Sequence, residues 1–245
     1  MEYETDYVIV AGVAWIRRTR VETSSGRVEE SMWLTTFDGD QPESHKADAG
    51  TMSVERGEIA GTAWDLSWSA LAAPFETPHR LLRRIAPTRL TTTPAVEVHG
   101  RIGDRVLSGA PGHTAHLSGI RHARTWGWAH ASTADGRWVH LLTASAPPLP
   151  RASQYADERR APGLPLAHSR VEPPRLTVGP YVVDAPVPSF IGLRYLDTDG
   201  SEIWCYHSEA ARLRGRGGDF SGAAMEIAMR DPFPAGAWPS DVRVT

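Results

Sequence analysis

The sequence predicts an all-β protein, because short segments of alternating polar and apolar residues recur along most of its 245 residues. Gly, Pro, Asp and Ser separate these segments, which is typical of tight turns between antiparallel strands. Evenly spaced hairpins of this kind indicate a β-sandwich or a barrel. One segment, Thr77 to Ile85, instead has the apolar stripe of a short helix.

Individual strands are expected at residues 7–14 and 31–37, where the alternation is clear. A third strand is expected from Ile59 to Trp68. Its indoles Trp64 and Trp68 share one face, since side chains two residues apart point to the same side of a strand. Three hairpins follow, each with a Gly-containing turn. They are expected over 95–107 (turn at Gly103-Asp104), 124–144 (turn at 134–136) and 190–207 (turn at 198–200).

Proline divides the chain. Seven of its 19 prolines lie in the segment from Pro147 to Pro174, and proline cannot donate the hydrogen bond that a central strand needs. We therefore expect a linker between two β units. The predicted organisation is an N-terminal unit over 1–148, a Pro-rich linker over 149–174 and a smaller C-terminal unit over 175–245.

Composition excludes several classes of function. A single cysteine excludes an internal disulfide framework and a four-cysteine metal site. The net charge of −3 argues against a nucleic-acid partner, and no apolar run is long enough for a transmembrane segment. The acidic first residues are unlike a basic secretory signal, so a cytoplasmic location is expected. Phosphate-loop, dinucleotide-binding and serine-nucleophile motifs are absent, and nothing in the sequence sets the oligomeric state.

Residues 109–140 carry the clearest functional signal, because five of the ten histidines and three of the nine tryptophans fall there. On a strand, Trp126, Trp128 and His130 project to one side, and the small residues between them project to the other. Such an aromatic face suits a concave site for a hydrophobic ligand. The same pattern is also typical of core packing, so both interpretations stay open.

Two other chemistries stay open as well. His113 and His116 have the spacing of a two-ligand metal fragment, which needs at least one more ligand. Cys205 and His207 share a strand face, so a thiol–imidazole pair is an alternative to an inert buried cysteine. Further metal ligands would come from His122, His130 or His140.

Several of these motifs together resemble a known family. They are the run from Val98 to Gly112, the pattern His-x-x-His-x-x-Gly, and Trp-Gly-Trp-Ala-His at 126–130. The chain thereby resembles the carotenoid 1,2-hydratase and AttH-like proteins over most of residues 60–145 and 188–212. The resemblance implies a lipocalin-like antiparallel barrel or sandwich of two packed β units. It also implies a cleft for isoprenoid- or polyketide-like molecules, and hydration, cyclisation or pericyclic ring closure without metal or organic cofactor.

The resemblance transfers roles to particular positions. His116 matches the histidine of the family's Asp-His-x-x-Gly motif, and Trp126 and Trp128 match its aromatic pair. The chain departs from the family at Ala115, where the hydratases place an acid, and at Ser118, where many members have tryptophan. An alkene-protonating acid would then have to come from elsewhere. The candidates are Asp65, Glu97 and Asp197.

Two functions follow as hypotheses. The first is a protein that binds a hydrophobic isoprenoid- or polyketide-like molecule and hydrates, cyclises or isomerises it without a cofactor, as a lyase or an isomerase. The second is a non-catalytic lipocalin-like carrier. His116 is the expected catalytic residue, and no metal is expected. The expected substrate-binding residues are Trp64, Trp68, His113, Trp126, Trp128, His130 and Tyr195.

Overall fold

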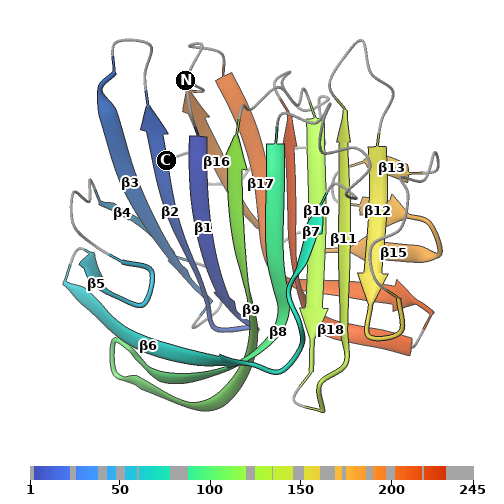
Figure 1. Ribbon diagram of the computed structural model, residues 1–245, viewed down its shortest axis with the longest axis horizontal. Helices are drawn as coiled ribbons and strands as arrows, with labels where there is room; N and C mark the ends of the chain where they lie inside the picture. The colour runs from blue at the N-terminus through green and yellow to red at the C-terminus, as the bar shows by residue number, and fades with distance from the viewer. Residues whose placement is uncertain are drawn as a thin grey trace. The chain divides into compact units, whose positions relative to one another are not determined.

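The computed structural model is built from antiparallel β-strands, and the residues it describes include no helix (Figure 1). None of its described segments is therefore a helix that could cross a membrane. Contacts divide the chain into two compact units, 1–121 with 132–137 and 122–131 with 138–245. The described residues are 3–22, 26–37, 43–47, 53–59, 61–77, 88–119, 125–133, 135–145, 152–160, 169–172, 175–185, 190–196, 202–216 and 218–229.

The first unit contains one sheet with the strand order β4-β3-β2-β1-β9-β8-β6-β5, and β7 pairs with β8. Its end strands β4 and β5 contact each other, so the sheet curls into a nearly closed barrel. The strands are β1 (Tyr3–Val10), β2 (Ala14–Glu22), β3 (Val28–Thr36), β4 (Glu43–Ala47), β5 (Arg56–Ile59), β6 (Thr62–Ala70), β7 (Phe75–Thr77), β8 (Thr88–Ile102) and β9 (Arg105–Gly119).

Alternation along these strands supplies the core of the first unit. On β1, Val8 and Val10 are fully buried and belong to one apolar cluster with Ile16 and Leu34 from the next two strands. Each fully buried side chain of this size contributes about 1.5–3 kcal/mol by leaving water. The cluster therefore fixes which face of each strand turns inward.

The second unit contains a sheet with the order β12-β11-β10-β18-β17-β15-β14-β13, and β16 pairs with β17. Its outer strands are β12 and β13, which come from the proline-rich part of the chain. The strands are β10 (Thr125–Ser132), β11 (Trp138–Ser145), β12 (Ala152–Asp157), β13 (Ser169–Glu172), β14 (Arg175–Val178), β15 (Tyr181–Asp184), β16 (Phe190–Leu196), β17 (Glu202–Gly215) and β18 (Gly218–Met229).

The strands of the three expected hairpins are all neighbours, and the turn expected at 198–200 lies outside the described residues. The strands β8 and β9 pair across Gly103, β10 and β11 are neighbours, and β16 pairs with β17. The expected strand from Ile59 to Trp68 is interrupted, because Gly61 adopts a left-handed φ of 82° and turns the chain between β5 and β6. Of the expected helix, Thr77 ends β7, and residues 78–87 lie outside the described part of the chain.

The division into units differs from the expected linker. Segment 149–174 contributes β12 and β13, two edge strands that pair with β11 and β14. Neither strand contains proline, because the prolines of this segment fall outside 152–157 and 169–172. The hairpin β10–β11 joins the C-terminal strands, since β10 pairs with β18. The boundary between the compact units thus falls near residue 121, ahead of the expected 148.

Candidate functional site

The strand β10 carries different chemistry on its two faces. Gly127 and Ala129 point toward the apolar core of the second unit, where Ala129 is fully buried. This side is tightly packed, since a Cβ on Gly127 would lie 3.2 Å from the Cδ1 atom of Leu176. The large side chains Trp126 and Trp128 alternate with these small residues and therefore lie on the opposite face.

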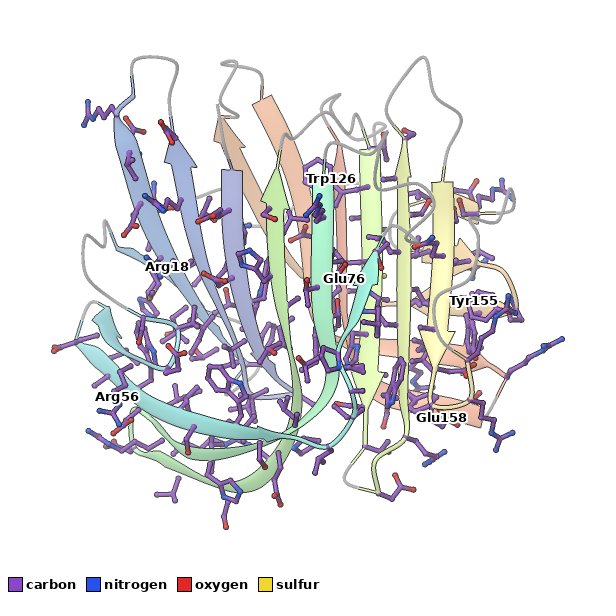
Figure 2. The ribbon with its side chains drawn as sticks, in the orientation of Figure 1. Arg18, Arg56, Glu76, Trp126, Tyr155 and Glu158 are labelled. Atoms are coloured by element: carbon purple, nitrogen blue, oxygen red, sulfur yellow. The ribbon has the colours of Figure 1, made fainter. Side chains whose placement is uncertain are left out.

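A buried carboxyl group lies beside these indoles. Glu226 on β18 stands directly opposite Trp128 in the β10–β18 register, and it is only 1% exposed. The Nε1–H group of Trp126 donates a hydrogen bond of 2.9 Å to its Oε1 atom. Its other oxygen, Oε2, is buried and has no hydrogen-bond partner among the described residues. Figure 2 labels Trp126 on this sheet.

Two imidazoles complete the same region of the sheet. His130 on β10 and His140 on β11 are 2% and 4% exposed, and their ring centroids lie 5.7 Å apart. Burial lowers the pKa of His140 from 6.5 to about 4, because the charged form would lose its hydration. At neutral pH the ring of His140 is therefore uncharged, and an uncharged imidazole can accept a proton.

We call Trp126, Trp128, His130, His140 and Glu226 the indole–carboxyl face. It combines a carboxyl group that can give a proton, an imidazole that can take one, and indole rings that attract positive charge. Trp128 is half-buried and the other four side chains are buried, so electrostatic interactions there are stronger than at the surface. This is the chemistry needed to protonate an apolar substrate and to stabilise the resulting cation.

His116, the expected catalytic residue, lies in the first unit on β9. In the β1–β9 register it stands opposite Asp6, and its Nδ1 atom is 2.8 Å from the Oδ1 atom of Asp6. Both side chains are partly open to solvent, at 47% and 35% exposed. Asp6 thus places a carboxylate beside His116, whereas the side chain of Ala115 points to the opposite face of β9.

Further charged residues lie on this side of the sheet, on β2 and β3. Arg18 stands opposite Asp6 in the β1–β2 register and forms an ion pair of 3.1 Å with Glu30. Arg20 contacts both Glu30 and Glu4. The His116–Asp6 pair therefore lies on the same side of the sheet as these partly exposed charges (Arg18 is labelled in Figure 2).

The other expected residues of the first unit have different surroundings. Trp64 is 2% exposed within the apolar core, and Trp68 packs against that core. His113 is 3% exposed, whereas His116 is half-exposed, because residues three apart on a strand point to opposite faces. The two histidines therefore cannot share a metal ion. No group of three metal-binding side chains occurs within the described ranges.

The acids proposed to replace the residue missing at 115 are also differently placed. Asp65 is exposed and forms an ion pair of 3.1 Å with Arg56, which Figure 2 labels at one edge of the sheet. Glu97 is half-exposed beside His99. Asp197, the side chain of Tyr195 and those of Cys205 and His207 lie outside the described part of the structure.

Glu226 was not among the expected site residues, and His140 was named only as an alternative metal ligand. The signal for Glu226 lies in Ala-Ala-Met-Glu-Ile-Ala-Met at 223–229, where one charged residue interrupts an otherwise apolar strand. A lone carboxylate in such a run has to be buried together with a partner. The partner, Trp126, lies 100 residues earlier in the chain, so the sequence alone does not reveal the pair.

Comparisons with known proteins define the class of the fold. The structure resembles the crystal structure of kievitone hydratase from Nectria haematococca, with a TM-score of 0.56 and 8% identity over 93% of this chain and 88% of that chain. Together with the strand arrangement, this similarity confirms an all-β, lipocalin-like fold. At this identity the similarity concerns the fold alone, and the resemblance to carotenoid 1,2-hydratases in particular stays a prediction.

In sequence, the chain is similar to two proteins from two strains of Mycobacterium tuberculosis. These are the uncharacterized proteins MT0513 and Rv0493c, each 26% identical over 248 residues that cover 81% of this chain and 74% of the relative. No family model matches the chain.

Proposed function

We propose that this protein binds a hydrophobic isoprenoid- or polyketide-like molecule at the indole–carboxyl face and adds water to a carbon–carbon double bond of that molecule without a cofactor. The observation that carries the proposal is Glu226, a buried carboxyl group held at Oε1 by Trp126, with Oε2 unoccupied by any described partner. The lipocalin-like neighbour is by name a hydratase, which agrees with this reaction class.

The reaction needs two proton transfers and the addition of one water molecule. The π electrons of the alkene take the proton of the Glu226 carboxyl group, which forms a new C–H bond and leaves a cation on the other carbon. The indole of Trp128, opposite Glu226 on β10, stabilises this cation through its negative ring face. Water then adds to the cation and gives up a proton to the neutral His140 imidazole, and return of this proton to Glu226 restores the site.

Replacement of Glu226 by glutamine tests this role. The amide keeps an oxygen for the Trp126 hydrogen bond but has no acidic proton, so we expect turnover to fall about 100-fold or more. The protein would be incubated with farnesol or kievitone in H₂¹⁸O, and mass spectrometry would measure labelled alcohol. Glu172→Gln is the matched control, because Glu172 is an exposed carboxylate paired with Arg170. Undiminished ¹⁸O incorporation by E226Q would contradict the assignment.

A non-catalytic carrier is the second candidate, and Ala115 favours it because the family's acid is missing there. A carrier binds ligand stoichiometrically and returns it unchanged. Native mass spectrometry of the freshly purified protein, followed by extraction of any bound molecule, would identify such a ligand. The carrier predicts no product with either wild type or E226Q, whereas the enzyme predicts product with wild type alone.

His116 is a second candidate for proton transfer, because Asp6 holds its ring in one orientation at 2.8 Å. His116→Ala would reduce turnover if this pair handles the proton. An unchanged rate in H116A, together with loss of activity in E226Q, would assign the chemistry to the second unit.

A further inference from the structure

A pocket of about 220 Å³ lies where β12 ends in the second unit. The chain turns back on itself there, since Asp157 and Arg160 form an isolated antiparallel bridge. Figure 2 labels Tyr155 and Glu158 at this position. The volume lies below the range of about 300–1,000 Å³ usual for drug-sized ligands, so the pocket suits a small ion or group. Its lining residues are Tyr155, Asp157, Glu158, Arg159, Arg160 and Arg216.

The two carboxylates of the pocket are occupied by partners within the protein. The hydroxyl group of Tyr181 donates to Oδ2 of Asp157 at 2.7 Å, and the backbone N–H of Arg159 donates to Oδ1 at 2.9 Å. Glu158 forms an ion pair with the Arg159 side chain at 3.6 Å. Of the three arginines that line the pocket, Arg159 therefore has its charge offset by a carboxylate, that of Glu158.

The other two arginines, Arg160 and Arg216, form no ion pair with a carboxylate of the described residues. Arg160 lies over the ring of Tyr155, 4.7 Å from its centroid, and donates a hydrogen bond to the hydroxyl group of the same tyrosine. Arg216 lies in the turn between β17 and β18 and is exposed. Neither guanidinium has a carboxylate within ion-pair distance in the described part of the chain.

Packing holds the Arg160 side of the pocket in place. The rings of Tyr155 and Tyr181 meet edge to face with centroids 5.3 Å apart, and Tyr181 is fully buried. Gly215 precedes Arg216 and allows close approach of the turn, because a Cβ at this position would lie 2.4 Å from the Cδ1 atom of Tyr181. The same tyrosine thus positions both the β12 end and the Arg216 turn.

We propose that this pocket binds a small oxyanion, a phosphate or carboxylate group, between Arg160 and Arg216. Three arginines against two carboxylates leave a net positive charge in the lining. The planar guanidinium fork matches the oxygen geometry of both anions, and charge-assisted hydrogen bonds are the stronger class. The proposal is independent of the reaction at Glu226.

Isothermal titration of the full chain with inorganic phosphate, and separately with acetate, at constant ionic strength tests the site. We expect saturable binding, and at least a tenfold weaker Kd for Arg216→Gln. The comparison of phosphate with acetate shows which oxyanion is preferred. Arg216 lies on an exposed turn, so R216Q is expected to keep the wild-type Tm.

Arg170→Gln is the matched control, because Arg170 pairs with Glu172 outside the pocket. R170Q is expected to bind phosphate within twofold of wild type. In the opposite direction, Glu158→Gln removes a negative charge from the lining and is expected to tighten binding about twofold to threefold. Absence of saturable binding to both anions, or equal affinities of wild type and R216Q, would overturn the proposal.

Discussion

The two units each hold a carboxylate against a ring nitrogen, yet the two pairs differ in their exposure to water. Glu226 accepts from Trp126 at 2.9 Å and is 1% exposed, whereas Asp6 meets His116 at 2.8 Å with both side chains partly solvated. The distances are nearly equal. Burial is therefore what separates a pair that is costly to break from one that water replaces easily.

The comparison also bears on chemistry. A carboxyl group in a largely dry region protonates an apolar substrate without competition from bulk water, and its interactions are not weakened by salt. The His116–Asp6 pair lies among Arg18, Arg20, Glu4 and Glu30, where solvent and neighbouring charges screen it. For this reason we propose Glu226 as the proton donor and keep His116 as the second candidate.

The largest effect on stability is expected from the burial of His140. Its pKa is about 4 in the folded protein and near 6.5 when unfolded. Between these pH values the unfolded state binds more protons, so the free energy of unfolding falls as the pH drops through this window, by about 3 kcal/mol in total. Urea unfolding of wild type and His140→Gln at a series of pH values measures this contribution.

The His140→Gln variant is the reference for that measurement, because histidines and carboxylates in general can also contribute to the pH dependence between pH 4 and 6.5. The variant keeps His130, whose ring centroid lies 5.7 Å from that of His140. The expected result is a flatter pH dependence in H140Q. Parallel curves for the two proteins would show that the burial of His140 does not set this dependence.

A smaller effect is expected from Trp126→Phe. Phenylalanine lacks the indole N–H group, so Oε1 of Glu226 loses its donor in a buried environment at a cost of about 1–3 kcal/mol. The same substitution in a Glu226→Leu background completes a double-mutant cycle. If W126F costs as much in that background as in wild type, the loss comes from packing and the hydrogen bond is not what stabilises the pair.

The smallest effect is expected from Asp6→Asn. Exposed pairs contribute about 0–1 kcal/mol, and salt reduces that further. Urea unfolding at low and high ionic strength is expected to show a difference below about 1 kcal/mol that shrinks with salt. A loss of several kcal/mol would mean that Asp6 and His116 are as important for stability as Glu226 and Trp126, and it would remove the contrast between the units.

Much of the fold follows from local patterns. The turn at Gly103 and the pairing of β8 with β9 were expected from the sequence, since a hairpin needs only neighbouring residues and a suitable turn pair. The alternation of Trp126 and Trp128 with small residues likewise predicted two distinct faces. These features depend on residues close in the chain, and for that reason they can be read from the sequence.

Other features depend on distant partners. The sequence showed His113 and His116 at the spacing of a two-ligand metal fragment, whereas β9 extends through both and turns them to opposite faces. It treated segment 149–174 as a linker, although β12 finds a neighbour in β11. In both cases pairing with another strand overrides the local composition, because sheet stability comes from cross-strand contacts.

The sequence by itself determined the class of fold, the hairpins and the aromatic strand, since period-two alternation and turn chemistry act over a few residues. Only the tertiary structure decided which acid and which histidines meet. Trp126 reaches Glu226 through the pairing of β10 with β18, and His116 reaches Asp6 through the pairing of β9 with β1. Burial is a property of the assembled sheet, and it is burial that gives these otherwise similar side chains different energies.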